Sequence, residues 1–344
     1  MIRNGESGFS LVEVLLAAVL TVGIIGAVFG LMNQNQRMFV TESSVTEMNQ
    51  SVRTAVDFLT RDVQSAGVGL PRGTGNYAAI FYTNGASGGT DSLLMVNGDL
   101  YAPVADLVPQ VGSSSTFNLL VPTGLNITGV GAGQTFTYND PSGTAHNIYQ
   151  TYATDPSYYL VYDDVRAMIF ALTANAQTTV VGATTQIQLT HATGNTMNNT
   201  ANFGTTIDQK FSTSIDTGAP NYSNARVAKL ANLIAYRINA TTKELERTED
   251  LTNWYAVARG ITDLQVKYRV LSRVAGVISE SILDAPTARA NIRSMIFTLK
   301  AETPDIDSAE KTYRKTVMTF EVSPRNLNLT NNNNLSATSP DQDS

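Results

Sequence analysis

The stretch GESGFSLVEVLLAAV, residues 5–19, places one acidic residue, Glu13, near the start of a long apolar run. From Phe9 to Met32, Glu13 is the only charged residue. A helix over these residues spans about 36 Å, enough to cross a hydrocarbon core of roughly 30 Å. The run therefore predicts a membrane-spanning helix over residues 9–32. A carboxyl group in hydrocarbon costs about 2.5–3.5 kcal/mol on insertion scales, so Glu13 needs a partner that offsets this cost.

The order of the parts argues against an ordinary secretory signal peptide. Such a signal has a basic leader, then an apolar stretch, and then a small-residue cleavage site. Here the leader MIRNGESG is only weakly basic, and the small residue suited to a protease, Gly8, precedes the apolar run. No clean A-x-A site follows directly behind the apolar run that ends at Met32. We therefore expect the apolar helix to stay in the protein rather than to be removed as a signal peptide.

A helical pattern continues beyond the apolar run. Apolar residues recur at a spacing of three and four and form one narrow stripe: Val45, Met48, Val52, Ala55, Val56, Leu59, Val63 and Ala66. Gly67 and Gly69 then supply a stop, and Pro71 lies just beyond. The sequence predicts one helix over Phe9–Ala66, amphipathic over 33–66, which packs its far half on a globular domain.

Glycines interrupt the apolar run at three positions, Gly23, Gly26 and Gly30. Gly26 and Gly30 form a GxxxG pattern, which lets helices approach closely in lipid. Glycine is also common in membrane helices that use it for no such purpose. Helix packing through Gly26 and Gly30 is therefore one of two interpretations that the residues by themselves leave open.

The segment Gly8-Phe9-Ser10-Leu11-Val12-Glu13 resembles the prepilin motif of type IV pilins and type II secretion pseudopilins. The resemblance implies that residues 1–8 are a leader peptide, which a membrane aspartyl peptidase removes between Gly8 and Phe9. The same enzyme would methylate the new amino terminus at Phe9. In the filament, the carboxylate of Glu13 would face the amino terminus of a neighbouring subunit, and an opposite charge nearby favours the ionised form. A pairing with Phe9 of its own helix is also available.

Short apolar runs separated by turn residues fill the rest of the chain. Most alternate at period two and carry β-branched or aromatic residues: Leu93–Val96, Phe117–Val121, Tyr158–Tyr162, Met168–Leu172, Gln186–Thr190, Leu230–Ile238, Leu264–Val270, Met295–Leu299 and Val317–Val322. We predict an α+β fold, in which the long helix packs on a large, mostly antiparallel β domain over residues 67–325. Residues 326–344 have too little apolar surface to fold and are predicted to be disordered.

Five blocks narrow the resemblance to PilW-type minor pilins and J-type pseudopilins. They are FLTRDVQSAGVG (58–69), IAYRINATTKELER (234–247), VARGITDLQVKYRV (257–270), NIRSMIFTLKAET (291–303) and TVMTFEVSPRN (316–326). Residues 70–225 match no pattern of either family. We expect them to hold an insertion that makes this chain large.

Composition and motifs favour no catalytic or nucleic-acid function. The net charge is −6 without a long basic run, which argues against nucleic acid as a partner, and there is no cysteine to form a disulfide or ligate a metal. His146 and His191 are paired with no acid at metal-ligand spacing. Asp163 and Asp164 could form a calcium site, but aspartate in a turn is the default. We predict no enzyme activity, no cofactor and no metal site.

One aromatic pair, Trp254 and Tyr255, could form a contact patch, but we expect the two rings to be buried.

The leading hypothesis is a minor pilin of a type IV pilus. The resemblance implies an inner-membrane protein with a periplasmic carboxy-terminal domain, which later moves into the pilus at the cell surface. Its partners would be other minor and major pilins, the prepilin peptidase, the inner-membrane assembly platform and, before assembly, membrane lipid. Because the globular part is too bulky to stack along a shaft, we expect few copies, in the priming or tip complex. The alternatives are a J-type pseudopilin and a filament-displayed adhesin whose residues 70–225 bind a ligand.

Overall fold

The computed structural model describes residues 10–70, 79–85, 88–108, 116–151, 157–162, 167–191, 225–274, 277–286, 292–307 and 310–325. The chain forms two compact units, one of residues 1–50 and 302–315 and one of residues 51–301 and 316–344. Each unit is described by itself below. The predicted disordered tail, 326–344, lies outside the described residues.

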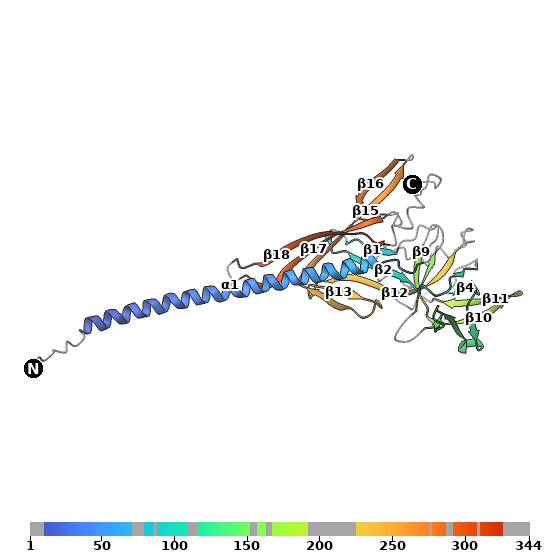
Figure 1. The fold of residues 1–344 in the computed structure, drawn as a ribbon, viewed down its shortest axis with the longest axis horizontal. Helices are drawn as coiled ribbons and strands as arrows, with labels where there is room; N and C mark the ends of the chain where they lie inside the picture. The colour runs from blue at the N-terminus through green and yellow to red at the C-terminus, as the bar shows by residue number, and fades with distance from the viewer. Residues whose placement is uncertain are drawn as a thin grey trace, which may run out of the picture. The chain divides into compact units, whose positions relative to one another are not determined.

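One continuous helix, α1, runs from Leu11 to Ser65, within two residues of the predicted range (Figure 1). The stop signal is confirmed, because Gly67 and Gly69 adopt the left-handed conformation, with φ of 82° and 75°. Glycine is the residue that tolerates this conformation at a helix end. The chain then joins a neighbouring strand: the amide of Gly67 donates to the carbonyl of Val96 at 2.9 Å, and that of Gly98 donates to Val68 at 2.8 Å.

The last turns of α1 belong to the larger unit and bury one face. Val52, Ala55, Leu59, Val63 and Ala66 are each at most 3% exposed, whereas Val56 is half-buried. Burial of a valine or leucine side chain contributes about 1.5–3 kcal/mol. The predicted amphipathic stripe is therefore confirmed as the face that holds the helix on the sheet.

In the smaller unit, two polar side chains are buried. One comes from α1 and the other from the residue that follows Ile306. Ser44 is buried, and its hydroxyl donates to Oδ2 of Asp305 at 3.5 Å. Asp307 is buried and accepts from Nε of Arg314 at 2.7 Å. These polar contacts hold residues 302–315 in place.

The largest sheet has eight strands. Its main path is β1 (Ile80–Thr83), β2 (Ser92–Gly98), β12 (Arg226–Asn239), β13 (Glu244–Thr248) and β14 (Tyr255–Arg259). The strands β3 (Ala105–Asp106), β8 (Tyr158–Tyr162) and β9 (Ala167–Ala171) join through the start of β12. The pairing of β12 with β2 has a register shift between Leu230 and Asn232, just after the residues 226–229 that pair with β8. Such a bulge bends a strand, so β12 can serve both parts of the sheet.

A second sheet has four strands in the order β16 (Val277–Leu283), β15 (Ile261–Val274), β17 (Ile292–Ile306) and β18 (Tyr313–Val322). One face is buried through Leu264, Val266 and Tyr268 of β15 and through Met295 and Phe297 of β17. Alternate residues therefore point away from the core, as the period-two pattern predicted.

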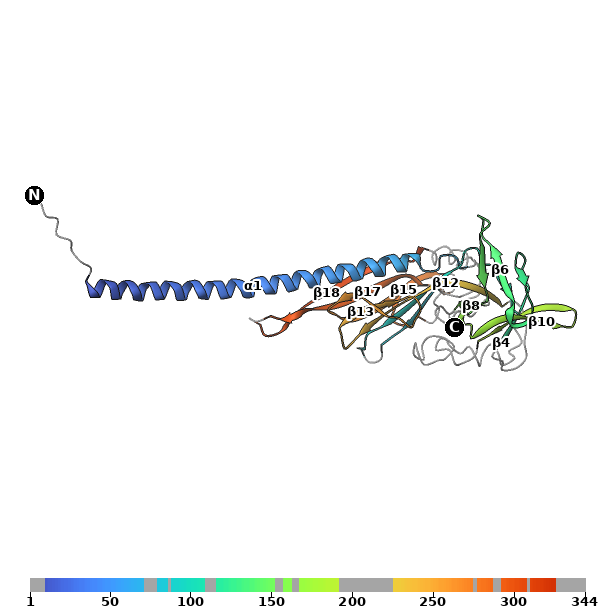
Figure 2. The same cartoon turned by 90° about the horizontal axis from the view of Figure 1, so that it is seen from below.

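Two three-stranded sheets complete the larger unit. One consists of β10 (Ala174–Val181), β11 (Thr184–Thr190) and β4 (Thr116–Leu120). The other consists of β5 (Asn126–Thr128), β6 (Thr135–Asn139) and β7 (Ala145–Ile148), with a short 3₁₀ turn, η2 (Gly131–Gly133), before β6. Figure 2 shows β4, β6 and β10 gathered beyond the start of β12.

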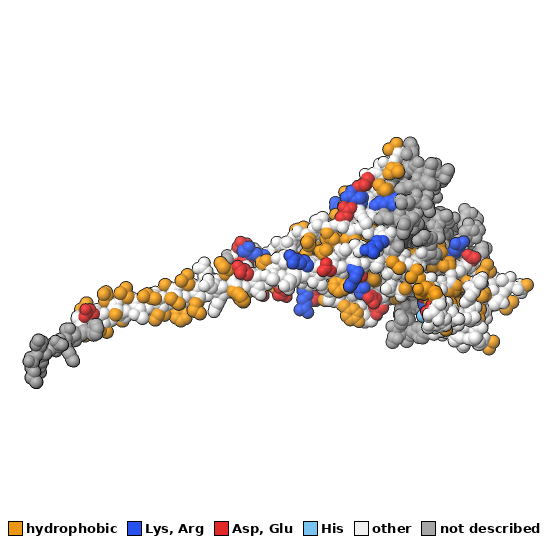
Figure 3. All heavy atoms as spheres, viewed as in Figure 1, with side chains coloured by type: hydrophobic (Ala, Val, Ile, Leu, Met, Phe, Trp, Pro, Cys, Tyr) orange, Lys and Arg blue, Asp and Glu red, His pale blue; other side chains and the backbone are white. Residues whose placement is uncertain are grey.

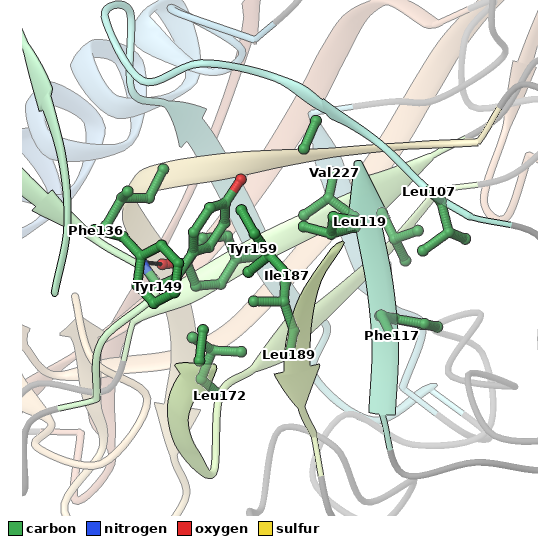
Figure 4. Close-up of a cluster of buried hydrophobic side chains, with 14 of the residues drawn as sticks. Leu107, Phe117, Leu119, Phe136, Tyr149, Tyr159, Leu172, Ile187, Leu189 and Val227 are labelled. Atoms are coloured by element: carbon green, nitrogen blue, oxygen red, sulfur yellow. Dashed lines mark hydrogen bonds between the residues drawn. The ribbon is translucent and has the colours of Figure 1, made fainter. Parts of the chain in front are cut away.

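These strands surround a hydrophobic core of their own (Figure 4). Tyr149, Tyr159 and Phe170 are fully buried and stack in series, with ring centroids 5.6 Å apart in each pair. The Tyr159 hydroxyl accepts from the amide of Tyr149 at 2.7 Å, which satisfies two buried polar groups.

The α+β fold, with a long helix packed on an antiparallel β domain, is confirmed. Every run that we predicted as a strand coincides with one. Residues 70–225, which we expect to hold an insertion, include β1 and β2, and these two are strands of the large sheet itself. The separate core instead draws on residues 105–227.

Candidate functional site

The first half of α1 exposes its apolar side chains on all sides. Val22 is 68% exposed, Phe29 67% and Phe39 73%. Within the described part of the chain, α1 is the one helix long and apolar enough to cross a membrane, and none of its most apolar stretch is buried. Figure 3 shows hydrophobic side chains along this part of the helix. An apolar surface of this extent indicates a site that lipid or another protein covers.

Glu13 lies in the first turn of α1 and closes a capping box. Oε2 of Glu13 accepts from the amide of Ser10 at 3.1 Å, and Oγ of Ser10 accepts from the amide of Val12 at 3.3 Å. A carboxylate here also interacts favourably with the positive end of the helix dipole. Glu13 therefore has a partner inside its own helix. The S-x-x-E pattern of residues 10–13 signals this cap, and our sequence analysis missed it.

The predicted cleavage site, Gly8 and Phe9, lies outside the described residues. The cut between these two residues and the methylation of Phe9 remain predictions.

Gly26 and Gly30 lie on the open surface of the apolar half. No heavy atom comes within 4 Å of the position that a Cβ would take at Gly23, Gly26 or Gly30. The GxxxG pattern therefore presents a smooth surface on which a second helix could lie, and its packing role stays a prediction. Nearby, the Thr21 hydroxyl donates to the carbonyl of Ala17 at 2.7 Å, so the helix satisfies this polar group itself.

A buried carboxylate fixes the last turns of α1 to the large sheet. Asp62 is 5% exposed, and its Oδ2 accepts from the Tyr236 hydroxyl at 2.5 Å and from Nε of Arg247 at 2.7 Å. Burial and the hydrogen bond to Asp62 raise the pKa of Tyr236. Burial alone would lower the pKa of Arg247. The hydrogen bonds to the carboxylates of Asp62 and Glu249 outweigh this effect, so the pKa of Arg247 is raised. We call these three residues the Asp62 link.

The Asp62 link joins two of the blocks on which the family resemblance rests. Asp62 belongs to FLTRDVQSAGVG, whereas Tyr236 and Arg247 belong to IAYRINATTKELER. Asp62 lies 174 positions from Tyr236 and 185 from Arg247, so the sequence alone could not show that they meet.

A cleft of about 750 Å³ lies beside this link in the larger unit. Among the residues that line it are Phe58, Tyr158, Lys229, Arg247 and Asp250. Its two cations already have partners: Nζ of Lys229 lies 3.2 Å from Oδ2 of Asp99, and Arg247 binds Asp62. Among the described residues, no group of three or more histidine, aspartate or glutamate side chains is placed to hold a metal ion.

The two histidines have structural environments. His191 is 4% exposed, and its ring centroid lies 4.3 Å from that of Phe117. Burial lowers its pKa to about 4. His146 lies beside one acid, which we did not predict: its Nε2 lies 3.0 Å from Oδ2 of Asp140. The turn between β6 and β7 brings them together, and Asp140 also accepts from the amide of Thr144 at 2.9 Å.

Two other predicted features have different outcomes. Asp163 and Asp164 lie outside the described residues. The expectation of a buried aromatic pair is wrong: Tyr255 is 68% exposed, and Trp254 is half-buried beneath the guanidinium of Arg237, 3.9 Å from the ring centroid.

No protein-family model, no curated protein and no solved structure matches this chain.

Proposed function

We propose that this chain is a type IV pilin-like subunit, a minor pilin that joins the priming or tip complex of a pilus. Residues 9–32 anchor it in the inner membrane with the globular part in the periplasm. The prepilin peptidase then cuts between Gly8 and Phe9, and the helix enters a filament of minor and major pilins. The chain works by assembly rather than by catalysis. The same features suit a J-type pseudopilin, and neighbouring genes for a pilus or for a secretion channel separate the two.

One observation carries the proposal. The prepilin-like motif at residues 8–13 leads directly into one helix whose two halves differ, the first exposed and apolar and the second buried on an antiparallel sheet. A simple membrane anchor needs no continuous second half. A filament subunit uses both, because the first half leaves lipid to pack among other helices and the second holds the globular domain.

Glu13 allows a sharp test, because its cap and its proposed contact with a neighbour need different chemistry. Glu13→Gln keeps an oxygen that accepts from the amide of Ser10 but removes the negative charge. Glu13→Ala removes both. If the charge pairs with the amino terminus of a neighbouring subunit, both variants insert in the membrane and both are depleted at least tenfold from sheared filaments.

The matched control is Glu42→Ala, which removes an exposed carboxylate farther along the same helix. This variant should reach filaments as the wild type does. Normal incorporation of Glu13→Gln, with loss of Glu13→Ala only, would show that Glu13 acts as a helix cap. Normal incorporation of both variants would contradict any assembly role for Glu13.

A second candidate function, display of a binding module, rests on the absence of charge around the separate core. Residues 107–139 and 167–207 contain no aspartate, glutamate, lysine or arginine. On the outer face of the β10–β11–β4 sheet, Gln177, Gln188 and Asn118 lie in register, and Nε2 of Gln188 donates to Oδ1 of Asn118 at 3.5 Å. A face of amides without charge suits an uncharged, hydroxyl-rich surface such as a neutral glycan.

Replacing Gln177 and Gln188 by alanine tests this second function. The variant should lose attachment to neutral glycan surfaces while pilus number stays unchanged, and attachment by the wild type should be insensitive to salt. Unchanged attachment of the variant would exclude this face as the binding site.

A further inference from the structure

The strand β16 is an open edge of the four-stranded sheet. It pairs with β15 over its whole length, from Val277 opposite Val274 to Leu283 opposite Tyr268. No strand pairs with its other side within the described residues. All seven residues are exposed, and four are aliphatic: Val277 (68%), Ile278 (56%), Ile282 (51%) and Leu283 (42%). Figure 1 shows β15 and β16 as a hairpin at the border of the sheet.

Proteins usually protect such an edge, because its free amide and carbonyl groups can pair with another chain. The edge strand β10 in the same unit is protected: the Gln134 side chain both accepts from the amide of Thr178 and donates to its hydroxyl, each at 2.6 Å. The amide of Ala176 donates to the carbonyl of Tyr149 at 2.9 Å. By contrast, β16 contains no lysine or proline, and its register with β15 runs without a bulge.

Charge on the outer face of this sheet indicates which strand would fit. Arg269 of β15 binds both Glu280 at the centre of β16 and Glu321 of β18, with 2.7 Å between its Nε and Oε1 of Glu321. The Ser294 hydroxyl also donates to Glu321. Among the side chains that the structure describes in this cluster, two carboxylates thus share one guanidinium. An additional cation beside Glu280 would give each of the two carboxylates a cation of its own.

The same charge argues against a second copy of this chain as the occupant. Glu280 is the middle residue of β16, so two antiparallel copies paired along their full length would place Glu280 opposite Glu280. Like charges directly opposite each other in a sheet are destabilising.

We propose that β16 receives an extended strand from a different polypeptide, which adds to the sheet through main-chain hydrogen bonds. The incoming strand carries a lysine or arginine opposite Glu280 and aliphatic residues two positions away on either side, opposite Ile278 and Ile282. Main-chain pairing supplies affinity, and the alternate side chains supply specificity. Nothing in this site involves the membrane helix, so its test is separate from that of the pilin assignment.

The test uses the full chain in detergent micelles and three labelled peptides with blocked ends. They are TITKTIT, TITETIT, which reverses the central charge, and N-methylated TITKTIT, in which methyl groups on the amides of residues 2 to 6 prevent a ladder in either strand direction. Fluorescence polarisation should show that the wild type binds TITKTIT at least tenfold more tightly than either other peptide. Glu280→Lys should reverse the preference between the two charged peptides. Ile278→Ser with Ile282→Ser should weaken TITKTIT binding about tenfold.

The matched control is Val180→Ser, which removes an exposed aliphatic side chain from the protected edge strand β10 and should leave peptide binding unchanged. Equal binding of N-methylated TITKTIT and TITKTIT, or no charge preference in the wild type, would overturn the proposal. So would binding that appears only after deletion of residues 326–344, because the chain's own tail would then occupy the edge. Concentration-dependent dimerisation that Ile278→Ser with Ile282→Ser abolishes would instead assign the edge to a second copy.

Discussion

The Asp62 link predicts that Arg247→Ala destabilises the larger unit far more than loss of an ordinary surface arginine. The Asp62 side chain is 6% exposed and that of Arg247 is 17% exposed. Without the guanidinium, Asp62 keeps the Tyr236 hydroxyl at 2.5 Å, and its nearest described cation is the exposed Arg61, whose Nε lies 3.8 Å from Oδ1. Removing one partner of a buried ion pair costs about 3–5 kcal/mol. Because Arg247 is partly accessible to water, we expect the lower end, about 3 kcal/mol.

The matched control is Arg259→Ala on β14. Nε of Arg259 lies 3.3 Å from Oε1 of Glu244, but the Arg259 side chain is 79% exposed. Exposed pairs of this kind contribute at most about 1 kcal/mol. The two variants therefore remove the same side chain from neighbouring strands and differ mainly in burial.

Urea unfolding of the full chain in detergent micelles measures both effects. The single tryptophan, Trp254, lies between β13 and β14 and reports on the sheet by its fluorescence. The double variant Asp62→Leu, Arg247→Met should regain most of the lost stability, because no buried charge is then left alone. The reasoning is refuted if Arg247→Ala costs no more than Arg259→Ala, or if Asp62→Leu and Arg247→Met are simply additive.

Two further changes have defined outcomes. In the same urea assay, Gly69→Ala should lower the free energy of unfolding by more than about 2 kcal/mol, because the new Cβ would lie 2.1 Å from the Gly98 carbonyl oxygen. Gly88 has a similar φ but open space around it, so Gly88→Ala should lower the free energy of unfolding by only about 1 kcal/mol. His191 has a folded-state pKa of about 4, below its usual 6.5, so the unfolded chain takes up the proton first on acidification. The free energy of unfolding should have its full value above about pH 6.5 and fall by up to about 3 kcal/mol towards pH 4. His191→Leu should abolish this pH dependence if burial of the neutral ring is its cause.

The helix and the apolar strands were predictable because each carries a strong local signal. The stripe from Val45 to Ala66 and the glycines after it fixed both the face and the end of α1. The runs around Tyr159 and Leu233 alternate at period two and are rich in residues that favour strands. By contrast, β5 and β7 are short and polar, and β16 has no buried face, so no periodic apolar pattern marks these three strands. The strand β6 does alternate, with Phe136 and Tyr138 buried, but we did not predict it because it is short.

The contacts of the candidate site are likewise of two kinds, local ones that the sequence can show and long-range ones that it cannot. The capping box of Ser10 and Glu13 is a local pattern and could have been found from the sequence. The Asp62 link could not, because it joins residues more than 170 positions apart through sheet pairing. The pair Trp254 and Tyr255 was predicted to be buried, but neighbouring residues in an extended chain point to opposite sides, so one ring faces solvent.

The most direct test of the pilin assignment is the mass of the amino-terminal peptide from the assembled fraction. Sheared filaments are digested, and the peptide that precedes the first cleavage is identified by mass spectrometry. The account predicts a chain that lacks residues 1–8 and begins with an N-methylated Phe9. An assembled chain that still carries Met1, or one that begins after Met32, would contradict it.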